Sequence, residues 1–309
     1  MPRKFTFSDD GSRYHTLKYH NLRFYGKPVY KAAVDAGFTC PNIDGSCGVG
    51  GCVYCSGGSG YFTAPELSVK EQILRETERI RASHPGAGII AYFQAHTNTY
   101  GSMERLREVY SQALECDICG ISAATRADCL DRERAEFLAS LGVPVTVELG
   151  LQTAQDSTAR LINRGHDLAR FVEGFNTARE AGLRICVHII DGLPGETPEM
   201  MLRTAEILGK MRPDGVKIHL LHVIKNTPLE GLWRSGEYLP MERESYIGTV
   251  VRQLELLPPE TVIERLTGDG DRETLLAPLW SLDKRSVLGG IMKRQKQLDS
   301  VQGLRFQEG

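Results

Sequence analysis

The feature that most constrains this chain is an alternation of short apolar β-type runs with longer helical patterns, which begins after residue 30 or so. The strand candidates are residues 28–36, 88–94, 117–124, 144–150, 184–190 and 215–222. The helix candidates are residues 67–83, 102–115, 131–141, 155–182 in two pieces, 197–211 and 241–256. Such strand-then-helix units predict a parallel sheet covered by helices.

Two architectures satisfy this alternation, a curved partial barrel and an open doubly wound sheet, and the period alone does not separate them. Several strand candidates are nearly continuous apolar runs, as expected for parallel strands that are covered on both faces. Residues 1–27 form an aromatic and basic prelude. Residues 257–309 depart from the alternation, with a strand-like run at 261–266 and a basic helix near 284–298.

A glycine-rich loop directly after the first strand holds four of the eight cysteines, namely Cys40, Cys47, Cys52 and Cys55. Glycines let a backbone turn tightly and approach a bulky inorganic group. Acidic residues hardly appear in the loop, so a site for a hard cation is not expected. Three alternatives remain, which are a structural zinc ion on four thiolates, two disulfides, and a [4Fe–4S] cluster on three thiolates with one iron left open.

The sequence predicts a cytoplasmic protein that does not bind membranes. The first ten residues lack the apolar core of a signal peptide, and no window approaches the roughly 20 apolar residues that a membrane helix needs. A reducing compartment disfavours disulfides, which leaves zinc and the iron–sulfur cluster as the two readings of the loop. The formal net charge of −2 gives no global basic field that would attract nucleic acid or anionic lipid.

Five ordered motifs extend beyond the cysteine loop. They are DAGFTCPNIDGSCGVGGCVYCSGG (35–58), YFQAHTNTYG (92–101), VELGLQTAQDSTARLINRGHD (147–167), VHIIDGLPGETPEMM (187–201) and RLTGDGDRETLLAPLWSLDKR (265–285). Together they resemble the radical S-adenosylmethionine (SAM) enzymes of the YhcC/YtqA type, relatives of the elongator catalytic subunit and of oxygen-independent coproporphyrinogen oxidases. The resemblance implies an α/β fold, a partial (β/α)6 TIM-like barrel over residues 28–256 with an N-terminal segment 1–27 and a short C-terminal extension 257–309.

The resemblance also implies the chemistry of the cysteine loop. Cys40, Cys52 and Cys55 would ligate a [4Fe–4S] cluster, and SAM would chelate the open iron. One electron from the reduced cluster, supplied by an external donor such as flavodoxin or ferredoxin, would break the C5′–S bond of SAM. The resulting 5′-deoxyadenosyl radical would take a hydrogen atom from the substrate. Cys47 departs from the family pattern and is interpreted as a spare thiol, although a swap with Cys40 or a four-thiolate cluster stays open.

The later motifs imply the residues that bind SAM, at the carboxyl ends of the strands. They are Gln94, Thr97, Asn98, Glu148, Gln152, Arg164, His188 and Gly192. The first three follow the second strand, where family members bind the amino group of SAM, although Gln-Ala-His replaces the usual glycine pair here. A polar loop cap is the structural alternative for this region.

The remaining members of this set have separate expected roles. Glu148 and Gln152 bracket the end of the fourth strand and can hydrogen-bond the ribose or the methionine part of SAM. Arg164 can pair with the SAM carboxylate as a planar fork, or can be a solvated arginine on a helix face. His188 matches a SAM-contacting position but can equally be a core histidine, and Gly192 permits close approach of the adenine.

The substrate does not follow from the sequence, and tRNA or another nucleic acid is suggested by kinship alone. The N-terminal segment and the tail KRQKQ (293–297) could contact phosphates, although a solvated charged face explains them as well.

The acetyltransferase and methylthiotransferase activities of relatives are not expected, because the corresponding extra domains are missing from this chain. The rival interpretation is a non-catalytic protein, either an iron–sulfur redox sensor or a zinc-stabilised interaction protein. The pair Cys116 and Cys119 is predicted to be buried strand thiols rather than a redox site.

Overall fold

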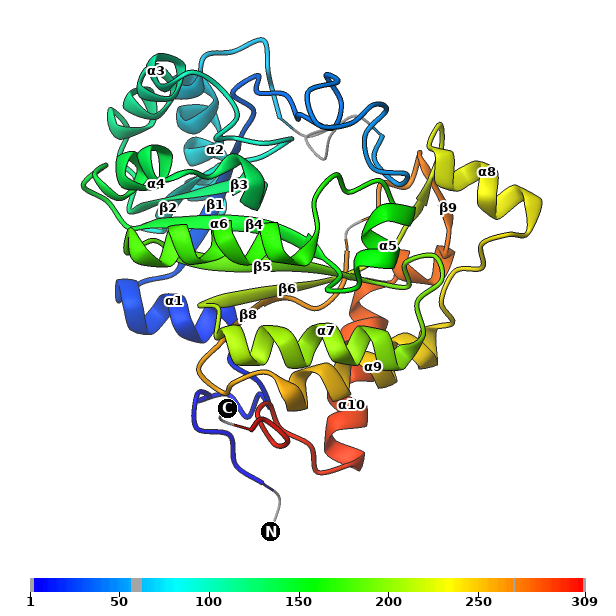
Figure 1. Ribbon diagram of the computed structural model, residues 1–309. Helices are drawn as coiled ribbons and strands as arrows, with labels where there is room; N and C mark the ends of the chain where they lie inside the picture. The colour runs from blue at the N-terminus through cyan, green and yellow to red at the C-terminus, as the bar shows by residue number, and fades with distance from the viewer. Residues whose placement is uncertain (1–2, 57–62, 269, 308–309) are drawn as a thin grey trace.

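A parallel sheet of seven strands forms the centre of the computed structural model, which describes residues 3–56, 63–268 and 270–307 (Figure 1). The strands follow the order β1-β2-β3-β4-β5-β6-β8, and every neighbouring pair is parallel. Their bounds are β1 Val29–Val34, β2 Gly88–Phe93, β3 Gly120–Thr125, β4 Val145–Gln152, β5 Arg184–Asp191, β6 Gly215–Leu220 and β8 Val262–Arg265. The sheet curls into a half barrel. The predicted partial barrel is therefore confirmed, and the open doubly wound sheet is excluded.

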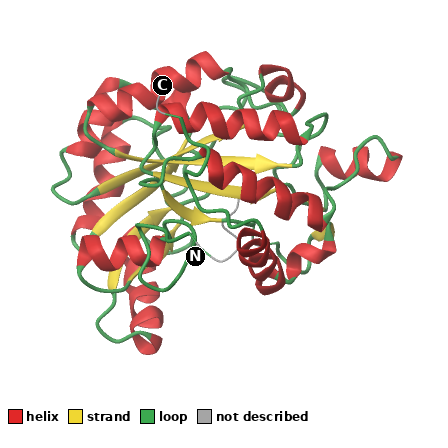
Figure 2. Cartoon of the chain, turned by 90° about the horizontal axis from the view of Figure 1, so that it is seen from below, coloured by secondary structure: helices red, strands yellow, loops and turns green. Residues whose placement is uncertain are grey.

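Helices cover the outer face of the curled sheet, so that the strands lie inside an incomplete ring of helices (Figure 2). Their bounds are α1 Leu17–Tyr25, α2 Val69–Ser83, α3 Met103–Leu114, α4 Arg132–Ala139, α5 Asp156–Leu161, α6 Leu168–Glu180, α7 Pro198–Met211, α8 Pro228–Ser235, α9 Arg243–Leu256 and α10 Lys284–Gln297. The sequence did not predict α1 and α8. Among the described residues, no helix combines the length and the apolar character that a membrane span requires.

The two faces of the sheet differ in chemistry, as β4 illustrates. Val147, Leu149 and Leu151 are fully buried in the apolar core between sheet and helices. The alternate residues Glu148 and Gln152 point to the other face, because successive side chains of a strand point to opposite sides. The expectation that apolar side chains cover both faces was therefore wrong for the inner face, which carries polar residues.

The C-terminal residues complete the sheet and tie the two ends of the chain together. Strand β8, which corresponds to the predicted run at 261–266, pairs with β6. A small second sheet pairs β7 (Val223–Ile224) with β9 (Leu275–Ala277). The Arg13 guanidinium contacts the Asp299 carboxylate at 3.0 Å, which joins the segment before α1 to the segment after α10.

Candidate functional site

A cavity of about 430 Å³ opens at the carboxyl ends of the strands. Its wall is built by the cysteine loop and by residues at the ends of β2, β3, β4, β5, β6 and β8. Ligands of α/β folds bind at this edge, where loops from several strands converge on one space. The cavity is therefore the candidate functional site of the chain.

The cavity brings together most of the residues that the sequence singled out. Those that line it are Cys40, Cys52, Cys55, Gln94, Thr97, Glu148, Gln152, Arg164 and His188. Asn98 and Gly192 do not belong to its lining. Asn98 is fully buried, and its side-chain amide donates to the carbonyl oxygens of Ala95 (3.1 Å) and Ala124 (2.9 Å), which joins the ends of β2 and β3. The Gly192 carbonyl accepts a hydrogen bond from Tyr238.

Three of the four loop cysteines face the same space. Burial raises the pKa of the Cys52 thiol, and the neighbouring Cys55 and Cys40 thiols add to the rise. Cys47 is exposed and lies outside the cavity lining. In the described part of the chain, no group of His, Cys, Asp or Glu side chains is close enough to hold a single metal ion. The three thiols sit around an open space, and a polynuclear cluster needs such room between its ligands.

Several polar atoms in the cavity wall are buried without a hydrogen-bond partner among the described residues. They are Nε2 of Gln94, Oε1 of Gln152, Nη2 of Arg164 and Nε2 of His219. Buried polar groups are nearly always satisfied, so a cluster of such atoms indicates a polar ligand. The donors and acceptors suit the amino, carboxylate and ribose groups of SAM. The wall therefore fits the expected cofactor.

The backbone around these atoms adopts an uncommon conformation. Ala95, His96 and Gln152 have φ angles of 43°, 57° and 61°, in the left-handed region that residues other than glycine seldom occupy. Such conformations cluster at functional sites, where the surrounding structure enforces them. At Gln152 the positive φ ends β4 and directs the side chain back over Gly150.

Arg164 is more constrained than the sequence suggested. It is 2% exposed, and its guanidinium donates to the carbonyl oxygens of Leu151 and Thr153 at the end of β4 and to that of His166. Only Nη2 makes no hydrogen bond to the described residues, and it lies 4.0 Å from the Asp156 carboxylate. The solvated helix-face alternative is therefore excluded by burial.

A polar layer crosses the inner face of the sheet beneath the cavity, with one residue from each of the seven strands. Its members are Lys31, Tyr92, Ser122, Glu148, His188, Lys217 and Glu264. Glu148 is at its centre, since Oε1 accepts from Lys31 (2.6 Å) and Ser122 (2.6 Å). Its Oε2 accepts from Lys217, Tyr92 (3.0 Å) and His188 (2.8 Å). Glu264 joins the layer through Lys31 at 2.9 Å.

The charges in this layer keep its carboxylates ionised and its histidine neutral. Burial opposes ionisation of Glu148, but Lys217 and Lys31 outweigh it and hold the pKa of this carboxyl well below its usual range. Burial lowers the pKa of His188, and the charge of Lys217 lowers it further. His188 is therefore neutral, with Nε2–H donated to Glu148 and Nδ1 left as an acceptor.

The predicted site residues did not include Lys31, Ser122, Lys217 or Glu264. A usable signal exists, because the strands place polar residues within otherwise apolar runs, as in PVYKAAV and GVKIHLL. Period-2 alternation identifies such positions as a distinct face of the sheet. The missing information is which strands are neighbours, since every partner of Glu148 in the layer lies on another strand.

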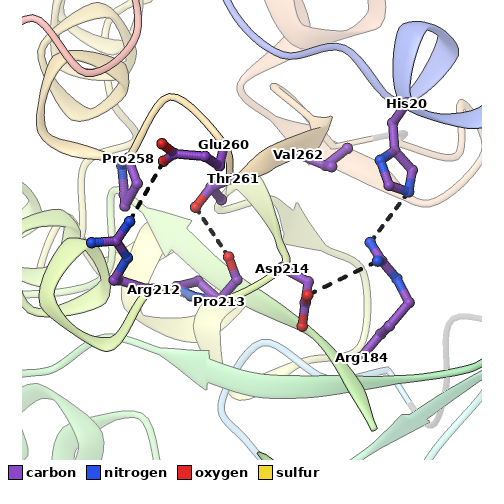
Figure 3. Close-up of a pocket in the computed structure, with 9 residues that line it drawn as sticks. All are labelled: His20, Arg184, Arg212, Pro213, Asp214, Pro258, Glu260, Thr261 and Val262. Carbon is purple, nitrogen blue, oxygen red and sulfur yellow. Dashed lines mark hydrogen bonds and ion pairs between the residues drawn. The ribbon is translucent and has the colours of Figure 1, made fainter. Parts of the chain in front are cut away.

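A second cavity, of about 200 Å³, lies at the opposite edge of the sheet and holds none of the predicted site residues. It is lined by charged side chains at the starts of β5, β6 and β8, and these are paired with each other (Figure 3). Arg184 contacts His20 at 3.2 Å and Asp214 at 3.9 Å, and Arg212 lies 3.9 Å from Glu260. Mutual pairing leaves this cavity without the unsatisfied groups that mark the first.

Two further features differ from their sequence interpretation or clarify it. Cys116 and Cys119 precede β3 and are partly exposed, so the prediction of buried strand thiols was wrong. The aromatic residues of the N-terminal segment stack on one another, with ring centroids 4.9 Å apart for Phe7 and His15 and 5.5 Å for His20 and Phe24. These rings therefore pack against each other within the protein.

Comparison with known proteins identifies the family. Residues 45–208 match the model of the radical SAM superfamily, and residues 213–297 match that of the Radical_SAM C-terminal domain. YtqA of Bacillus subtilis (strain 168) is 43% identical over 308 residues, which are 98% of this chain and 96% of YtqA. YhcC of Escherichia coli (strain K12) is 38% identical over 263 residues, 84% of either chain.

More distant relatives match part of the chain or its fold. The tRNA uridine(34) acetyltransferase of Dehalococcoides mccartyi (strain CBDB1) is 29% identical over 172 residues, 55% of this chain and 37% of the other. The solved structure of archaeal Methanocaldococcus infernus Elp3 covers 87% of this chain with a TM-score of 0.67 at 19% identity, and this chain spans 64% of that one. This structural match shows a shared fold.

A half-barrel sheet carries a cysteine loop and a polar cavity at its carboxyl edge, and the radical SAM model matches more than half of the residues. Identity to YtqA extends along nearly the whole chain. The protein is therefore a member of the radical SAM superfamily and a radical SAM enzyme.

Proposed function

We propose that this enzyme holds a [4Fe–4S] cluster on Cys40, Cys52 and Cys55 and binds SAM beside it in the 430 Å³ cavity. The observation that carries the proposal is the meeting of these three thiols with unsatisfied buried polar atoms in one cavity wall. When bound, the reduced cluster supplies the electron that cleaves SAM and releases a 5′-deoxyadenosyl radical for hydrogen abstraction. The protein contributes placement of the cofactor and exclusion of water.

Different residues of the cavity wall bind different groups of SAM. Arg164 Nη2 receives the carboxylate of SAM, because its other nitrogens are held by backbone carbonyls. Gln94 and Gln152 offer an amide donor and an amide acceptor to the amino acid and ribose parts. His188 accepts a hydrogen bond at Nδ1, and its neutrality keeps another positive charge away from the sulfonium of SAM. Asn98 supports the wall through its bonds to backbone carbonyls.

The substrate is proposed to be a nucleic acid, and the electron donor a flavodoxin or a ferredoxin. Support for the substrate class comes from the partial relative that acts on tRNA, by its name a tRNA uridine(34) acetyltransferase. At the side of β6 and its neighbour β8, the cavity lining includes His219 of β6, His222 just after β6 and Arg265 of β8. Polar and cationic groups on this side suit a phosphate-bearing substrate.

Anaerobic electron paramagnetic resonance of the reconstituted, reduced protein tests the cofactor assignment. We expect a reduced [4Fe–4S] signal that shifts on addition of SAM, because SAM would occupy the open iron. Single cysteine-to-alanine variants at positions 40, 52 and 55 should lose the signal. Cys47→Ala is the matched control and should keep it, because Cys47 is exposed and outside the cavity lining.

Each alternative has its own outcome in this experiment. A signal that ignores SAM would indicate a four-thiolate cluster and a sensor role. A signal lost in Cys47→Ala but kept in Cys40→Ala would assign Cys47 as the ligand in place of Cys40. Stoichiometric zinc without a cluster would contradict the proposed cofactor and support the interaction protein instead.

A further inference from the structure

We propose that Asn163 is a positioning residue that clamps the cysteine loop against the wall of the cavity, an inference that rests on the function proposed above. Asn163 lies in the turn after α5, and its Nδ2 donates to the carbonyl oxygens of Val49 (3.1 Å) and Gly51 (2.8 Å). One amide group thus uses both of its hydrogens on the loop. The two carbonyls belong to the stretch that leads directly into Cys52.

Asn42 completes the clamp from the side of the loop. Its Nδ2 donates to the carbonyl oxygen of Asn163 and also lies 3.7 Å from Sγ of Cys52. A single side chain therefore connects the turn to a predicted cluster ligand. Hydrogen bonds to a ligating sulfur orient it and affect the reduction potential of an iron–sulfur cluster.

Two glycines make room for Asn42, which is 1% exposed. A Cβ atom at Gly48 would lie 2.1 Å from Oδ1 of Asn42, and one at Gly165 would lie 2.9 Å from it. Gly48 belongs to the loop and Gly165 to the turn, so the side chain is enclosed by both partners. This close approach gives a physical reason for part of the glycine content of the loop.

The backbone adds to these contacts and connects them to the sheet. Val53 N–H donates to the carbonyl oxygen of Ile162 at 3.1 Å, and Asn163 itself has a φ of 54°, which asparagine tolerates better than most residues. The next residue, Arg164, is anchored to the end of β4. The turn therefore holds the loop at a defined position relative to the SAM-binding wall. Ligands of a preorganised site need such support.

Asn163→Gly tests the clamp, because glycine accepts the positive φ and removes both amide donors. Asn226→Gly is the matched control, since Asn226 is exposed and has a φ of 62° but lies in the turn before α8. Two readouts are measured anaerobically, which are amide hydrogen exchange of residues 40–56 in iron-free protein and the rate of iron release from reconstituted protein to a chelator. We expect both rates to rise about 10-fold in Asn163→Gly and to stay at the wild-type values in the control.

Asn42→Ala is a second variant, which decides the question if Asn163→Gly does not fold. It should also accelerate exchange and iron release, because it removes the bond to the turn from the other side. Wild-type rates in the folded variants would overturn the clamp and leave the cluster proposal intact. If the wild-type protein takes up no iron, the cluster proposal fails, and exchange in iron-free protein alone decides the clamp. Accelerated exchange would then support it and unchanged exchange would refute it.

Discussion

Glu148 shows at the scale of a single residue how the tertiary structure alters a sequence-based role. The sequence suggested a direct hydrogen bond to SAM, but five donors already surround the carboxylate. A carboxylate offers about four lone-pair sites, so the group is saturated. Glu148 is therefore expected to act through His188, whose ring it orients and whose tautomer it selects.

Glu148→Gln should destabilise the protein strongly. The substitution removes one of the two carboxylates that compensate the buried Lys217 and the partly buried Lys31, so that Glu264 alone faces both lysines. Breaking a buried ion pair costs about 3–5 kcal/mol. Urea denaturation measures the free energy of unfolding. The control is Glu173→Gln in an exposed pair with Arg170, where we expect a change below about 1 kcal/mol. Equal effects of both substitutions would show that the polar layer does not depend on the charge of Glu148.

Local sequence signals specify individual elements with good accuracy, as α2 shows. Ser68 and Glu71 stand at the spacing of a capping box, and both of its reciprocal hydrogen bonds are present at the start of the helix. The two missed helices, α1 and α8, are preceded by the capping residues Thr16 and Thr227, whose side chains accept hydrogen bonds from the first helical turn. Helix α8 also has a proline at its first position, a start signal that the sequence analysis could have used.

Removal of the cap of α2 should have a modest and local effect. Ser68→Ala deletes the acceptor for the Glu71 amide, and we expect the free energy of unfolding to fall by about 1 kcal/mol. Ser83→Ala, at the exposed end of the same helix, is the control and should change it by less than about 0.5 kcal/mol. Thermal and urea unfolding both report the difference. A loss that is no larger in Ser68→Ala than in Ser83→Ala would mean that the cap contributes little.

At the scale of the whole molecule, the N-terminal segment packs against the half barrel at the edge where its strands begin. His20 of α1 contacts Arg184 at the start of β5, and a bridge pairs Thr16 with Ile263 of β8. Burial lowers the pKa of His20 to about 4, and the Arg184 and His15 charges lower it as well. The contacts of the N-terminal segment therefore keep His20 neutral at pH values well below the ordinary histidine pKa of 6.5.

Acid should weaken the folded state in a way that His20 partly controls. Between pH 6.5 and pH 4 the unfolded chain protonates this histidine and the folded protein does not, so the free energy of unfolding falls as the pH falls. One such group contributes a slope of up to about 1.4 kcal/mol per pH unit. Urea denaturation from pH 7 to pH 4.5 should therefore give a smaller slope for His20→Gln than for the wild type. Identical slopes would mean that His20 protonates equally in both states.

Much of the architecture could be predicted because its causes are local. All six predicted strands and the two-piece helical region 155–182 were found, since apolar periodicity and chain length determine strand-then-helix units. The cysteine spacing and the later motifs likewise indicated one site at the carboxyl edge. Asn98 and Gly192 lie outside its lining, since a motif specifies a loop but not which of its residues face the cavity.

The sequence by itself determined the units, their order and the position of the cysteine loop after the first strand. Only the tertiary structure decided that one polar residue from each of seven strands joins a layer centred on Glu148. It also decided that the sheet curls rather than staying open, and that the Asn163 side chain binds the cysteine loop. The physical reason is distance along the chain. Lys31 Nζ and a Glu264 carboxylate oxygen lie 2.9 Å apart although the residues belong to the first and the last strands of the sheet. No local pattern encodes a contact that exists only after the sheet has curled.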